Sequence, residues 1–442
     1  MPALDVLILG SGAREHALAW RLARDEGVRR VSIAPGNGGT EACGRNIADL
    51  NILDPVAVAR HAARERYGLV VVGPEAPLAV GVADALEQAS VPVFGPSREA
   101  ARLESSKAFA KEQMARADIP TAPSATFRDT EAAVAHARRS DRPPVVKADW
   151  LAAGKGVVVP DTHDEAERAI RSLLDGAGPG ATVVLEERLT GREVSVFALL
   201  SGEAVVAIGA ACDYKRLGDA DIGPNTGGMG GYSPVPWFGR PQTEEAVATV
   251  FEPIAWRMAR DGVPYRGVLY AGLMLTDAGP MVLEFNARFG DPEAQVLLPM
   301  LDGDLSAALL GAATGDRGLM EESIAARDGA ALGVVVASEG YPERPAVGRP
   351  IAAAEPSGPG DRGPLLCFHG GTRRRVEGGH ETTGGRAVTF VGRGNDLAAA
   401  RAAAYSGVAG SVLDGRQYRS DIGLRELKLG AGSSAFGIRS SS

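Results

Sequence analysis

The stretch LDVLILGSGAREHALAW (residues 4–20) places an apolar run before a glycine-containing turn and a helical segment. Further apolar runs follow at VSIAPG (31–36), LVVVG (69–73) and VPVFG (91–95). Short apolar runs that alternate with helical segments are typical of a parallel sheet covered by helices. We therefore predict a multidomain chain of α/β and α+β class that begins with a parallel α/β domain over residues 1–104.

The turn GSGAR (10–14) can aim backbone N–H groups at a phosphate, or it can be a plain tight turn. It departs from a dinucleotide-binding fingerprint because Glu15 stands at the third glycine position, where a side chain would obstruct close packing of helix and strand. The second predicted strand also ends without the acidic residue that would bind a ribose hydroxyl. Both features disfavour an NAD-dependent oxidoreductase.

The middle of the chain, residues 105–329, predicts a second domain that contains a smaller unit at about 124–193. Strands are predicted at 145–148 (VVKA), 156–159 (GVVV) and 182–189 (TVVLEERL). Thr162 and Glu165 have the spacing of a capping box, and the apolar residues after them predict an amphipathic helix. Long strand-like runs at 193–214 and 266–288 flank a glycine-rich loop (223–234) and a helix at about 243–261.

The last part, residues 330–428, predicts a C-terminal α/β domain with strands at 332–337, 365–368 and 387–391. Residues 429–442 are rich in glycine and serine and are expected to form a disordered tail.

Composition excludes several classes of protein. A hydrophobic fraction of 45% and a charged fraction of 23% are those of a globular chain, and a net charge of −8 argues against nucleic acid as the main partner. The three cysteines form no CxxC pair, which disfavours a zinc ribbon or a redox motif. No apolar run approaches the ~18 residues of a membrane span. The N-terminus lacks a basic targeting segment, so we expect a cytoplasmic location.

The segment KADWLAAGKG (147–156) places two lysines around a loop of small residues between two predicted strands. Small residues let backbone amides approach phosphate oxygens, and such a loop can close over a ligand. The segment is not a Walker A loop, because Asp149 and Gly156 stand where that motif needs glycine and Ser or Thr. A glycine-rich hairpin without a ligand is the alternative.

The segment LEFNARFGDPE (283–293) is the most informative. On a strand, Glu284, Asn286 and Arg288 share one face. A carboxylate and an amide oxygen suit Mg²⁺, which prefers oxygen ligands and completes its shell with waters and substrate phosphates. The alternative is a solvated strand face. The glycine-rich segment GPNTGGMGGYSP (223–234) is predicted to be a loop that closes over substrate or, alternatively, a surface loop.

In this order, the segments resemble the glycinamide ribonucleotide synthetase family of the ATP-grasp superfamily over about residues 4–428. Seven strings carry the resemblance: GSGAREHALAW (10–20), APGNGGT (34–40), VGPEAPL (72–78), SSKAFAK (105–111), KADWLAAGKG, GPNTGGMGGYSP and LEFNARFGDPE. The resemblance implies an ATP-grasp core of two subdomains. It also implies the ATP-dependent ligation of glycine to 5-phosphoribosylamine through glycyl phosphate, a step of de novo purine biosynthesis. The cofactors would be ATP and Mg²⁺ or Mn²⁺, and the protein would be a monomer with small-molecule partners.

The resemblance also implies roles for individual residues. Lys147, Arg288, Asp213 and Lys215 would be catalytic. ATP would contact Lys107, Lys147, Lys155 in a flap at 149–156, Glu186, Glu187, Leu189 and Glu193. The metal ligands would be Glu284 and Asn286. Glycine, its acyl phosphate and the phosphoribosylamine would contact Asn225, Thr226, Gly227, Gly228, Met229, Gly230 and Asp291, and the phosphoribosyl part would contact Gly12, Glu15, Asn37 and Glu75.

Three positions depart from the family pattern. Trp150 stands where the family usually has a glycine in the flap, so the conformation of that loop can differ. Ala287 replaces a residue that is often cysteine, and it faces away from Glu284. The strand GVLYAGLM (267–274) lacks an acid that many ATP-grasp enzymes have, so a metal would depend more on Glu284 and Asn286.

Two alternatives remain open at this point. A related ATP-grasp ligase could join a different acid to a different amine. A nucleotide-binding regulatory protein without turnover would bind ATP or ADP but would release no ADP in response to an amino acid.

Overall fold

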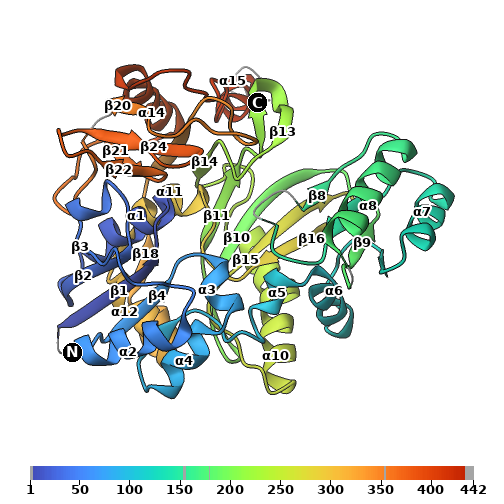
Figure 1. Cartoon of the computed structure of the whole chain (residues 1–442), viewed down its shortest axis with the longest axis horizontal. Helices are drawn as coiled ribbons and strands as arrows, with labels where there is room; N and C mark the ends of the chain where they lie inside the picture. The colour runs from blue at the N-terminus through green and yellow to red at the C-terminus, as the bar shows by residue number, and fades with distance from the viewer. Residues whose placement is uncertain (1–2, 153–155, 179, 353–354, 434–442) are drawn as a thin grey trace, which may run out of the picture.

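The computed structural model describes residues 3–152, 156–178, 180–352 and 355–433. Its strands form a five-stranded sheet, an eight-stranded sheet, two four-stranded sheets and two short two-stranded sheets. Among the described residues, no helix is long and apolar enough to cross a membrane. Figure 1 shows the N-terminal part (blue) and the C-terminal part (orange and red) on one side, with a small unit around α7 and α8 projecting on the other.

The N-terminal sheet is parallel and has the order β3-β2-β1-β4-β5. Its central strand β1 is buried on both faces, so alternate residues belong to different cores. Leu7 and Leu9 pack with the helices α2 and α4, whereas Val6 and Ile8 pack with α1 and with α12 (Leu305–Thr314). The predicted parallel α/β architecture is therefore confirmed. The elements are β1 (Leu4–Gly10), α1 (Ala13–Leu22), β2 (Val28–Pro35), β3 (Arg45–Asn46), α2 (Pro55–Glu65), β4 (Leu69–Val72), α3 (Glu75–Ala79), α4 (Val82–Gln88) and β5 (Val93–Phe94).

The small unit is an antiparallel sheet, β6-β9-β7-β8, covered by two helices. It has its own core, in which Ala166, Ile170 and Leu174 of α8 pack against the sheet, as the amphipathic pattern predicted. Thr162 caps α8, but the Glu165 carboxylate accepts a hydrogen bond from Asp161 N instead of Thr162 N, so the predicted capping box is incomplete. The elements are β6 (Ser124–Phe127), α7 (Thr130–Arg139), β7 (Val145–Ala148), β8 (Val157–Val158), α8 (His163–Ala177) and β9 (Val183–Glu186), and α5 (Arg102–Ser105) and α6 (Lys107–Arg116) precede them.

The eight-stranded sheet is antiparallel and has the order β16-β15-β10-β11-β14-β19-β24-β21. Its first five strands come from the middle of the chain and its last three from the C-terminal part. They are β10 (Arg192–Ser201), β11 (Ala204–Asp213), β14 (Gly230–Ser233), β15 (Arg266–Thr276), β16 (Gly279–Asn286), β19 (Ala330–Ala337), β21 (Leu365–His369) and β24 (Arg386–Gly394). The helices α9 (Arg240–Ala246), α10 (Glu252–Arg260), α11 (Glu293–Leu297), α12 (Leu305–Thr314) and α13 (Arg317–Glu322) belong to the middle segment.

The glycine-rich segment 223–234 is not simply a loop, which corrects the prediction. Residues 230–233 form β14, which is fully buried between β11 and β19, and β12 (Arg216–Gly218) pairs with β13 (Ile222–Asn225). Backbone pairing needs no side chains, and glycine allows a close approach here. A Cβ at Gly231 would lie 2.6 Å from the carbonyl oxygen of Cys212.

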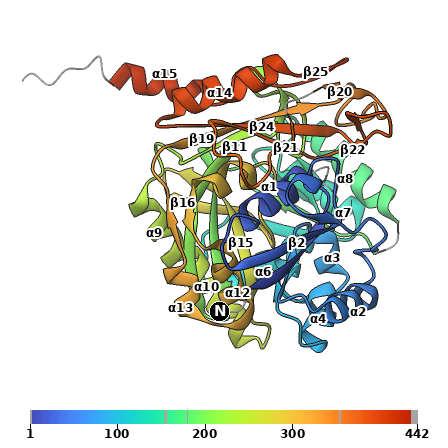
Figure 2. The same ribbon diagram turned by 90° about the vertical axis from the view of Figure 1, so that its left-hand side faces the viewer.

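In the C-terminal part, α14 (Leu397–Gly410) covers the outer side of the sheet next to β24 (Figure 2). A four-stranded sheet, β22-β23-β20-β25, lies beside it. Its strands are β20 (Pro350–Ala352), β22 (Thr372–Arg374), β23 (His380–Thr382) and β25 (Val412–Leu413), and β17 (Leu301–Gly303) pairs with β18 (Ile324–Ala326). The last helix, α15 (Leu424–Ser433), extends into the segment predicted to be a disordered tail. Residues 434–442 of that segment lie outside the described residues.

Candidate active site

Two adjoining cavities are lined by most of the residues that the sequence predicted for the site. The first, of about 630 Å³, lies between the small unit, α6 and the strands β11, β15 and β16. The second, of about 850 Å³, lies between the turn after β1 and C-terminal residues 370–374 and 383–386. Gly227 and Asp291 line both cavities, so the two spaces adjoin at these residues.

Most of the predicted site residues line these cavities. The first cavity is lined by Glu75, Lys107, Lys147, Glu186, Glu187, Leu189, Glu193, Asp213, Lys215, Asn225, Thr226, Glu284, Asn286 and Arg288, besides the two shared residues. Gly12 and Asn37 line the second cavity. Glu15, Gly228, Met229 and Gly230 line neither, and Lys155 lies outside the described residues.

Two buried lysines share one carboxylate in the first cavity. Lys147 Nζ on β7 lies 2.9 Å from Glu186 Oε2 and donates a hydrogen bond to the carbonyl oxygen of Leu283. Lys111 Nζ on α6 lies 3.3 Å from the same oxygen. Burial lowers the pKa of Lys111, and the charge of Lys147 lowers it further, against the effect of Glu186. When both lysines are protonated and Glu186 is ionised, the three side chains together carry one net positive charge. Lys111 was not predicted, although it lies at the end of the string SSKAFAK (105–111).

The segment before the undescribed residues 153–155 is hydrogen-bonded to the start of α6. Asp149 Oδ1 accepts hydrogen bonds from Ser106 Oγ (3.0 Å) and Ala108 N (2.9 Å) at the start of that helix. Trp150 follows and lines the first cavity together with Leu151 and Ala152. The indole therefore belongs to the cavity wall.

A second group of charged side chains lies at β11. Lys215 Nζ is 2.7 Å from Glu193 Oε2 and 3.0 Å from Asp213 Oδ1. The positive charge of Lys215 holds the pKa of Glu193 below its usual range. Burial raises the pKa of Asp213. Nearby Glu293, which was not predicted, is buried, and burial together with the charge of Asp213 raises its pKa to about 7.

Glu284, Asn286 and Arg288 all line the first cavity, as predicted. The strand β16 ends at Asn286, however, so Arg288 lies just beyond it, and Phe285 lines the cavity as well. Arg288 donates to Asn286 Oδ1 (3.1 Å) and pairs with Glu104 Oε1 (2.8 Å) and Glu75 Oε2 (3.2 Å). Burial lowers the pKa of Arg288, but these two carboxylates raise it above its ordinary value. Glu104 was not predicted.

The opposing strand carries Gly272 at the position paired with Glu284. Among the described residues, no three His, Cys, Asp or Glu side chains form a metal-binding group. Glu284 and Asn286 nevertheless present a carboxylate and an amide oxygen to the same cavity. Such a pair fits Mg²⁺ or Mn²⁺ when substrate phosphates and waters supply the other ligands.

Glu15 shapes the first turn instead of facing a cavity. Its carboxylate accepts hydrogen bonds from Gly12 N (2.5 Å) and Arg14 Nε (2.6 Å), and the residue is 1% exposed. Space for it comes from two glycines, because a Cβ at Gly73 would lie 2.2 Å from Glu15 Oε1 and one at Gly10 would lie 2.6 Å from its Cδ. The obstruction expected from a side chain at position 15 is thus removed by glycine at two other positions.

Asn37 is a structural brace of the second cavity. Its Nδ2 donates to the carbonyl oxygens of Ser11 (2.9 Å) and His369 (2.7 Å), and its Oδ1 accepts from Gly39 N (2.8 Å). The side chain therefore joins the turn after β1 to the C-terminal part.

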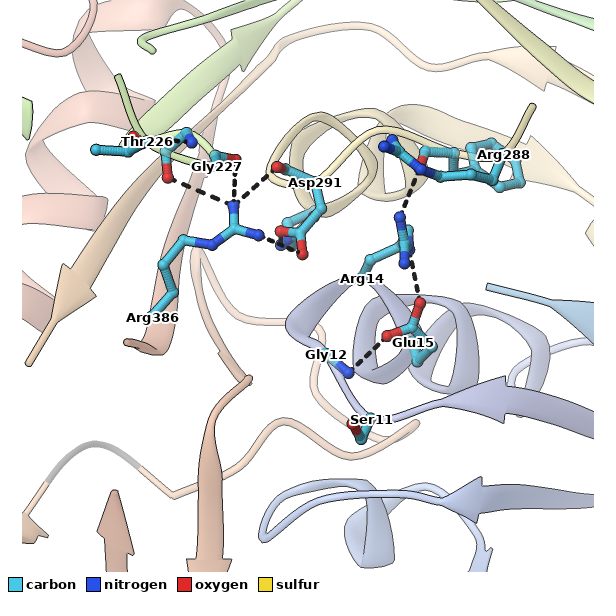
Figure 3. Close-up of polar contacts among 12 residues, drawn as sticks. Ser11, Gly12, Arg14, Glu15, Thr226, Gly227, Arg288, Asp291 and Arg386 are labelled. Carbon is cyan, nitrogen blue, oxygen red and sulfur yellow. Dashed lines mark hydrogen bonds and ion pairs between the residues drawn. The ribbon is translucent and has the colours of Figure 1, made fainter. Parts of the chain in front are cut away.

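Arg386, at the start of β24, lies where the two cavities meet (Figure 3). Its guanidinium donates to the carbonyl oxygens of Gly227 and Asp291 and pairs with Asp291 Oδ2 (2.9 Å). Burial raises the pKa of Asp291, but Arg386 and Arg14 together hold it below its usual range. Arg386 was not predicted, because no local motif marks an arginine in GGRAV (384–388).

Comparison with known proteins assigns most of the chain to one family. Models of the phosphoribosylglycinamide synthetase N domain, ATP-grasp (A) domain and C domain match residues 4–104, 105–294 and 331–425. The phosphoribosylamine–glycine ligase of Mycobacterium leprae is 44% identical over 433 residues, which cover 96% of this chain and 99% of that protein. The enzyme of the same name from Streptomyces coelicolor is 47% identical over 419 residues, covering 95% and 98%.

Solved structures agree with this assignment. The crystal structure of phosphoribosylamine–glycine ligase from Thermotoga maritima has a TM-score of 0.81 and 34% identity, and the match covers 95% of this chain and 100% of that chain. The biotin carboxylase domain of Hydrogenobacter thermophilus 2-oxoglutarate carboxylase has a TM-score of 0.69 at 16% identity over 95% and 92%. That second likeness shows that the two chains share a fold.

Proposed function

This chain belongs to the phosphoribosylglycinamide synthetase family, and we propose that it forms glycinamide ribonucleotide through a glycyl phosphate intermediate. Its family makes it an ATP-binding carbon–nitrogen ligase of purine biosynthesis. The observation that carries the proposed intermediate is the meeting of two cavities at Gly227 and Asp291. One cavity has the residues for ATP and glycine, and the other has space for a phosphoribosyl group.

The reaction has two steps. A glycine carboxylate oxygen attacks the γ-phosphorus of ATP, the bond to the β-phosphate oxygen breaks, and ADP leaves. The amine of phosphoribosylamine then attacks the glycyl carbonyl carbon. The new C–N bond replaces the C–O bond to phosphate, the phosphate leaves with the electron pair, and the nitrogen releases its extra proton to solvent. Both steps need alignment and charge neutralisation, and neither needs a covalent protein nucleophile.

The nucleotide occupies the first cavity in this proposal. Lys107 and Lys147 contact its phosphates. The role of the predicted flap at 149–156 stays a prediction, because residues 153–155, Lys155 among them, lie outside the described residues. The Glu186 carboxylate is already engaged by Lys147 and Lys111. Its role is therefore to hold Lys147 in place, while the adenine lies against residues 187–189 and the ribose against Glu193.

Glu284 and Asn286 would hold Mg²⁺ or Mn²⁺ in the same cavity. The bound ion would neutralise negative charge on the phosphates during transfer. Arg288 lies next to Asn286 and adds a fixed positive charge for the transferred phosphoryl group. Its pairs with Glu75 and Glu104 keep the guanidinium in one orientation.

Glycine and its acyl phosphate lie between β11 and the junction of the cavities. Lys215, braced by Asp213 and Glu193, supplies a positive charge there. Asn225, Thr226 and Gly227 line the path from this group to the junction. Gly228 and Gly230 act through the backbone, because a Cβ at Gly228 would lie 2.3 Å from Pro292 Cδ and one at Gly230 would lie 2.5 Å from the carbonyl oxygen of Gly333. Met229 is buried behind them.

The phosphoribosyl group occupies the second cavity. Gly12 and Asn37 form one wall, and C-terminal residues 370–374 form the opposite wall. Glu15 contributes indirectly, because it fixes the turn at Gly12. Glu75 lies on the first-cavity side and holds Arg288. The protein acts as a monomer on small molecules in this proposal.

The test is coupled ADP release with Mg-ATP, glycine and freshly generated phosphoribosylamine, in which each component is omitted in turn. Product formation that requires all three supports the ligase. A hydroxylamine trap should capture activated glycine as the hydroxamate when the amine is omitted, which tests the intermediate. Nucleotide binding without glycine-dependent ADP release contradicts the proposal and favours a regulatory protein. ADP release that depends on another acid favours a related ligase.

A further inference from the structure

We propose that Arg386 is a positioning residue that fixes the junction where the amine of phosphoribosylamine meets the activated glycine. This inference rests on the proposed function. It assigns a role in the second chemical step to the C-terminal part of the chain, through a side chain that touches the segments on both sides of the junction.

The Arg386 guanidinium is a clamp on two separate segments. One terminal nitrogen, Nη1, donates to the carbonyl oxygens of Gly227 and Asp291, the latter at 2.8 Å. The other, Nη2, donates to Asp291 Oδ2 at 2.9 Å. Gln295 Nε2 donates to the other carboxylate oxygen at 2.7 Å, so both oxygens of Asp291 have a fixed donor. The clamp leaves this carboxylate a single orientation.

The clamped groups are those that line both cavities. Asp291 Oδ2 also approaches the turn after β1, since a Cβ at Gly12 would lie 3.5 Å from it. Gly227 packs directly on the clamp, because a Cβ there would lie 3.0 Å from Arg386 Cζ. If the guanidinium moved sideways, Gly227 and Asp291 would move with it. These two residues form the surface along which the amine reaches the glycyl carbonyl carbon in the proposed reaction.

The loop that carries Asp291 is held from its other side by Arg14 of α1. Arg14 Nη1 donates to the carbonyl oxygen of Phe289 at 3.1 Å. Figure 3 shows Arg386 on one side of this loop and Arg14 on the other. A planar fork with several fixed donors can span the acceptors of two segments, whereas a lysine offers a single point charge. The geometry thus requires arginine at position 386.

The effect should be confined to the second substrate. Arg386 does not line the first cavity, which the proposed function assigns to the nucleotide. In Arg386→Gln, we expect kcat/KM for phosphoribosylamine to fall by roughly 10- to 100-fold, because small displacements of aligned groups are costly. The KM for ATP and the hydroxamate formed from glycine should stay within about twofold of wild type. Arg386→Lys should recover only part of the loss.

The matched control is Arg393→Gln. Arg393 lies on the same strand, donates to the carbonyl oxygen of Gly363 and lines neither cavity, so its removal costs the same charge without touching the junction. A double-mutant cycle with Asp291→Asn adds a second measurement. If Arg386 acts through Asp291, Arg386→Gln should cost much less in the Asp291→Asn background than in wild type.

The outcomes separate this proposal from the one on which it rests. A wild-type protein that needs no phosphoribosylamine overturns the proposed function itself. If the wild type is an amine-dependent ligase, three results would overturn the role of Arg386. Arg386→Gln could lower kcat/KM for ATP and for phosphoribosylamine equally, or Arg386→Lys could be fully active. The losses of kcat/KM in the double-mutant cycle with Asp291→Asn could also be additive. Should the glutamine variant fail to fold, the lysine variant and its cycle with Asp291→Asn carry the same test.

Discussion

Lys147 is the residue whose removal should affect the nucleotide most directly. Its ammonium group is held by Glu186 and by the carbonyl oxygen of Leu283 at the wall of the first cavity. Lys147→Ala should lower kcat/KM for ATP by at least about 10-fold, which corresponds to about 1.4 kcal/mol of lost transition-state stabilisation. Initial rates at varied ATP measure this, with Lys428→Ala on the exposed side of α15 as the control. If the two variants had equal kcat/KM for ATP, Lys147 would not contact the phosphates.

Glu284 tests the metal site at the same scale. Glutamine keeps the size of the side chain and removes its negative charge, so Glu284→Gln should raise the Mg²⁺ concentration needed for half-maximal activity by roughly 10-fold or more. A titration of activity against free Mg²⁺ at saturating ATP measures the shift. An unchanged titration curve would mean that the carboxylate does not hold the ion.

Gly73 shows how a residue outside both cavities supports the site. A methyl group there would collide with Glu15 Oε1, whose carboxylate holds Gly12 N. Gly73→Ala should therefore destabilise the protein by about 1–3 kcal/mol, as overpacking of a buried site does. Gly176→Ala in α8 is the control, since a Cβ there meets nothing within 4 Å and should stabilise the helix. Denaturant unfolding of both variants should show opposite signs.

Site residues that lie close together in the sequence could be predicted from it. Glu284 and Asn286 share a cavity because strand periodicity puts them on one face of β16, and Arg288 follows just after the strand ends and lines the same cavity. Lys111, Glu104 and Arg386 were missed because their partners are distant in the chain. Arg386 reaches Gly227, 159 positions away, and no local pattern encodes that meeting.

Among the elements, the segment after β7 adds an aromatic side chain to the wall of the first cavity. Trp150 lines the first cavity directly before the undescribed residues 153–155. We expect the tryptophan emission of the wild type to change when Mg-ATP binds, and Trp150→Gly to lose most of that change. Stopped-flow fluorescence measures both. If the variant and the wild type gave fluorescence changes of equal amplitude, the change would come from one of the other three of the four tryptophans.

Strand β14 is the element that the sequence described least well. Its glycines give neither apolar alternation nor β-branched residues, which are the usual signals of a strand. It forms because β11 and β19 offer backbone partners on both sides. The strands β1, β7, β10 and β24 could be predicted because each contains a run of apolar residues, which is the usual sequence signal of a buried strand.

At the scale of the whole molecule, buried histidines join the two ends of the chain. His16 Nδ1 on α1 accepts from His369 N (2.9 Å), and its Nε2 lies 3.0 Å from the carbonyl oxygen of Ser357. Burial lowers the pKa of His16 from 6.5 to about 4. Burial, together with the neighbouring histidines, lowers the pKa of His369 to about 2. Both side chains are therefore neutral in the folded protein at mildly acidic pH.

This arrangement predicts a loss of stability in mild acid. Between pH 6.5 and about 4, the unfolded chain binds a proton at His16 that the folded chain does not, so the free energy of unfolding decreases as the pH falls. The contribution of His16 is roughly 3 kcal/mol across this window. His16→Gln offers an acceptor and a donor without titrating, so its unfolding free energy should depend less steeply on pH. Parallel slopes for the two proteins would contradict the assignment.

The division into domains stays a prediction at this scale. The proposed boundaries at residues 104 and 329 follow changes of pattern in the sequence. The eight-stranded sheet, however, runs without interruption from the middle segment into the C-terminal part. Such continuity depends on strand pairs far apart in the chain, which periodicity cannot reveal.

The place of β14 in that sheet has a consequence for how the protein is made. Residues 230–233 leave the ribosome long before residues 330–337, which pair with one of their edges. Until β19 emerges, the nascent chain carries an open strand edge beside Asp213, and open edges invite pairing with other chains. Arg386 emerges later still. The junction of the two cavities is therefore completed only during the last quarter of synthesis, and until then the unfinished sheet is open to pairing with other chains.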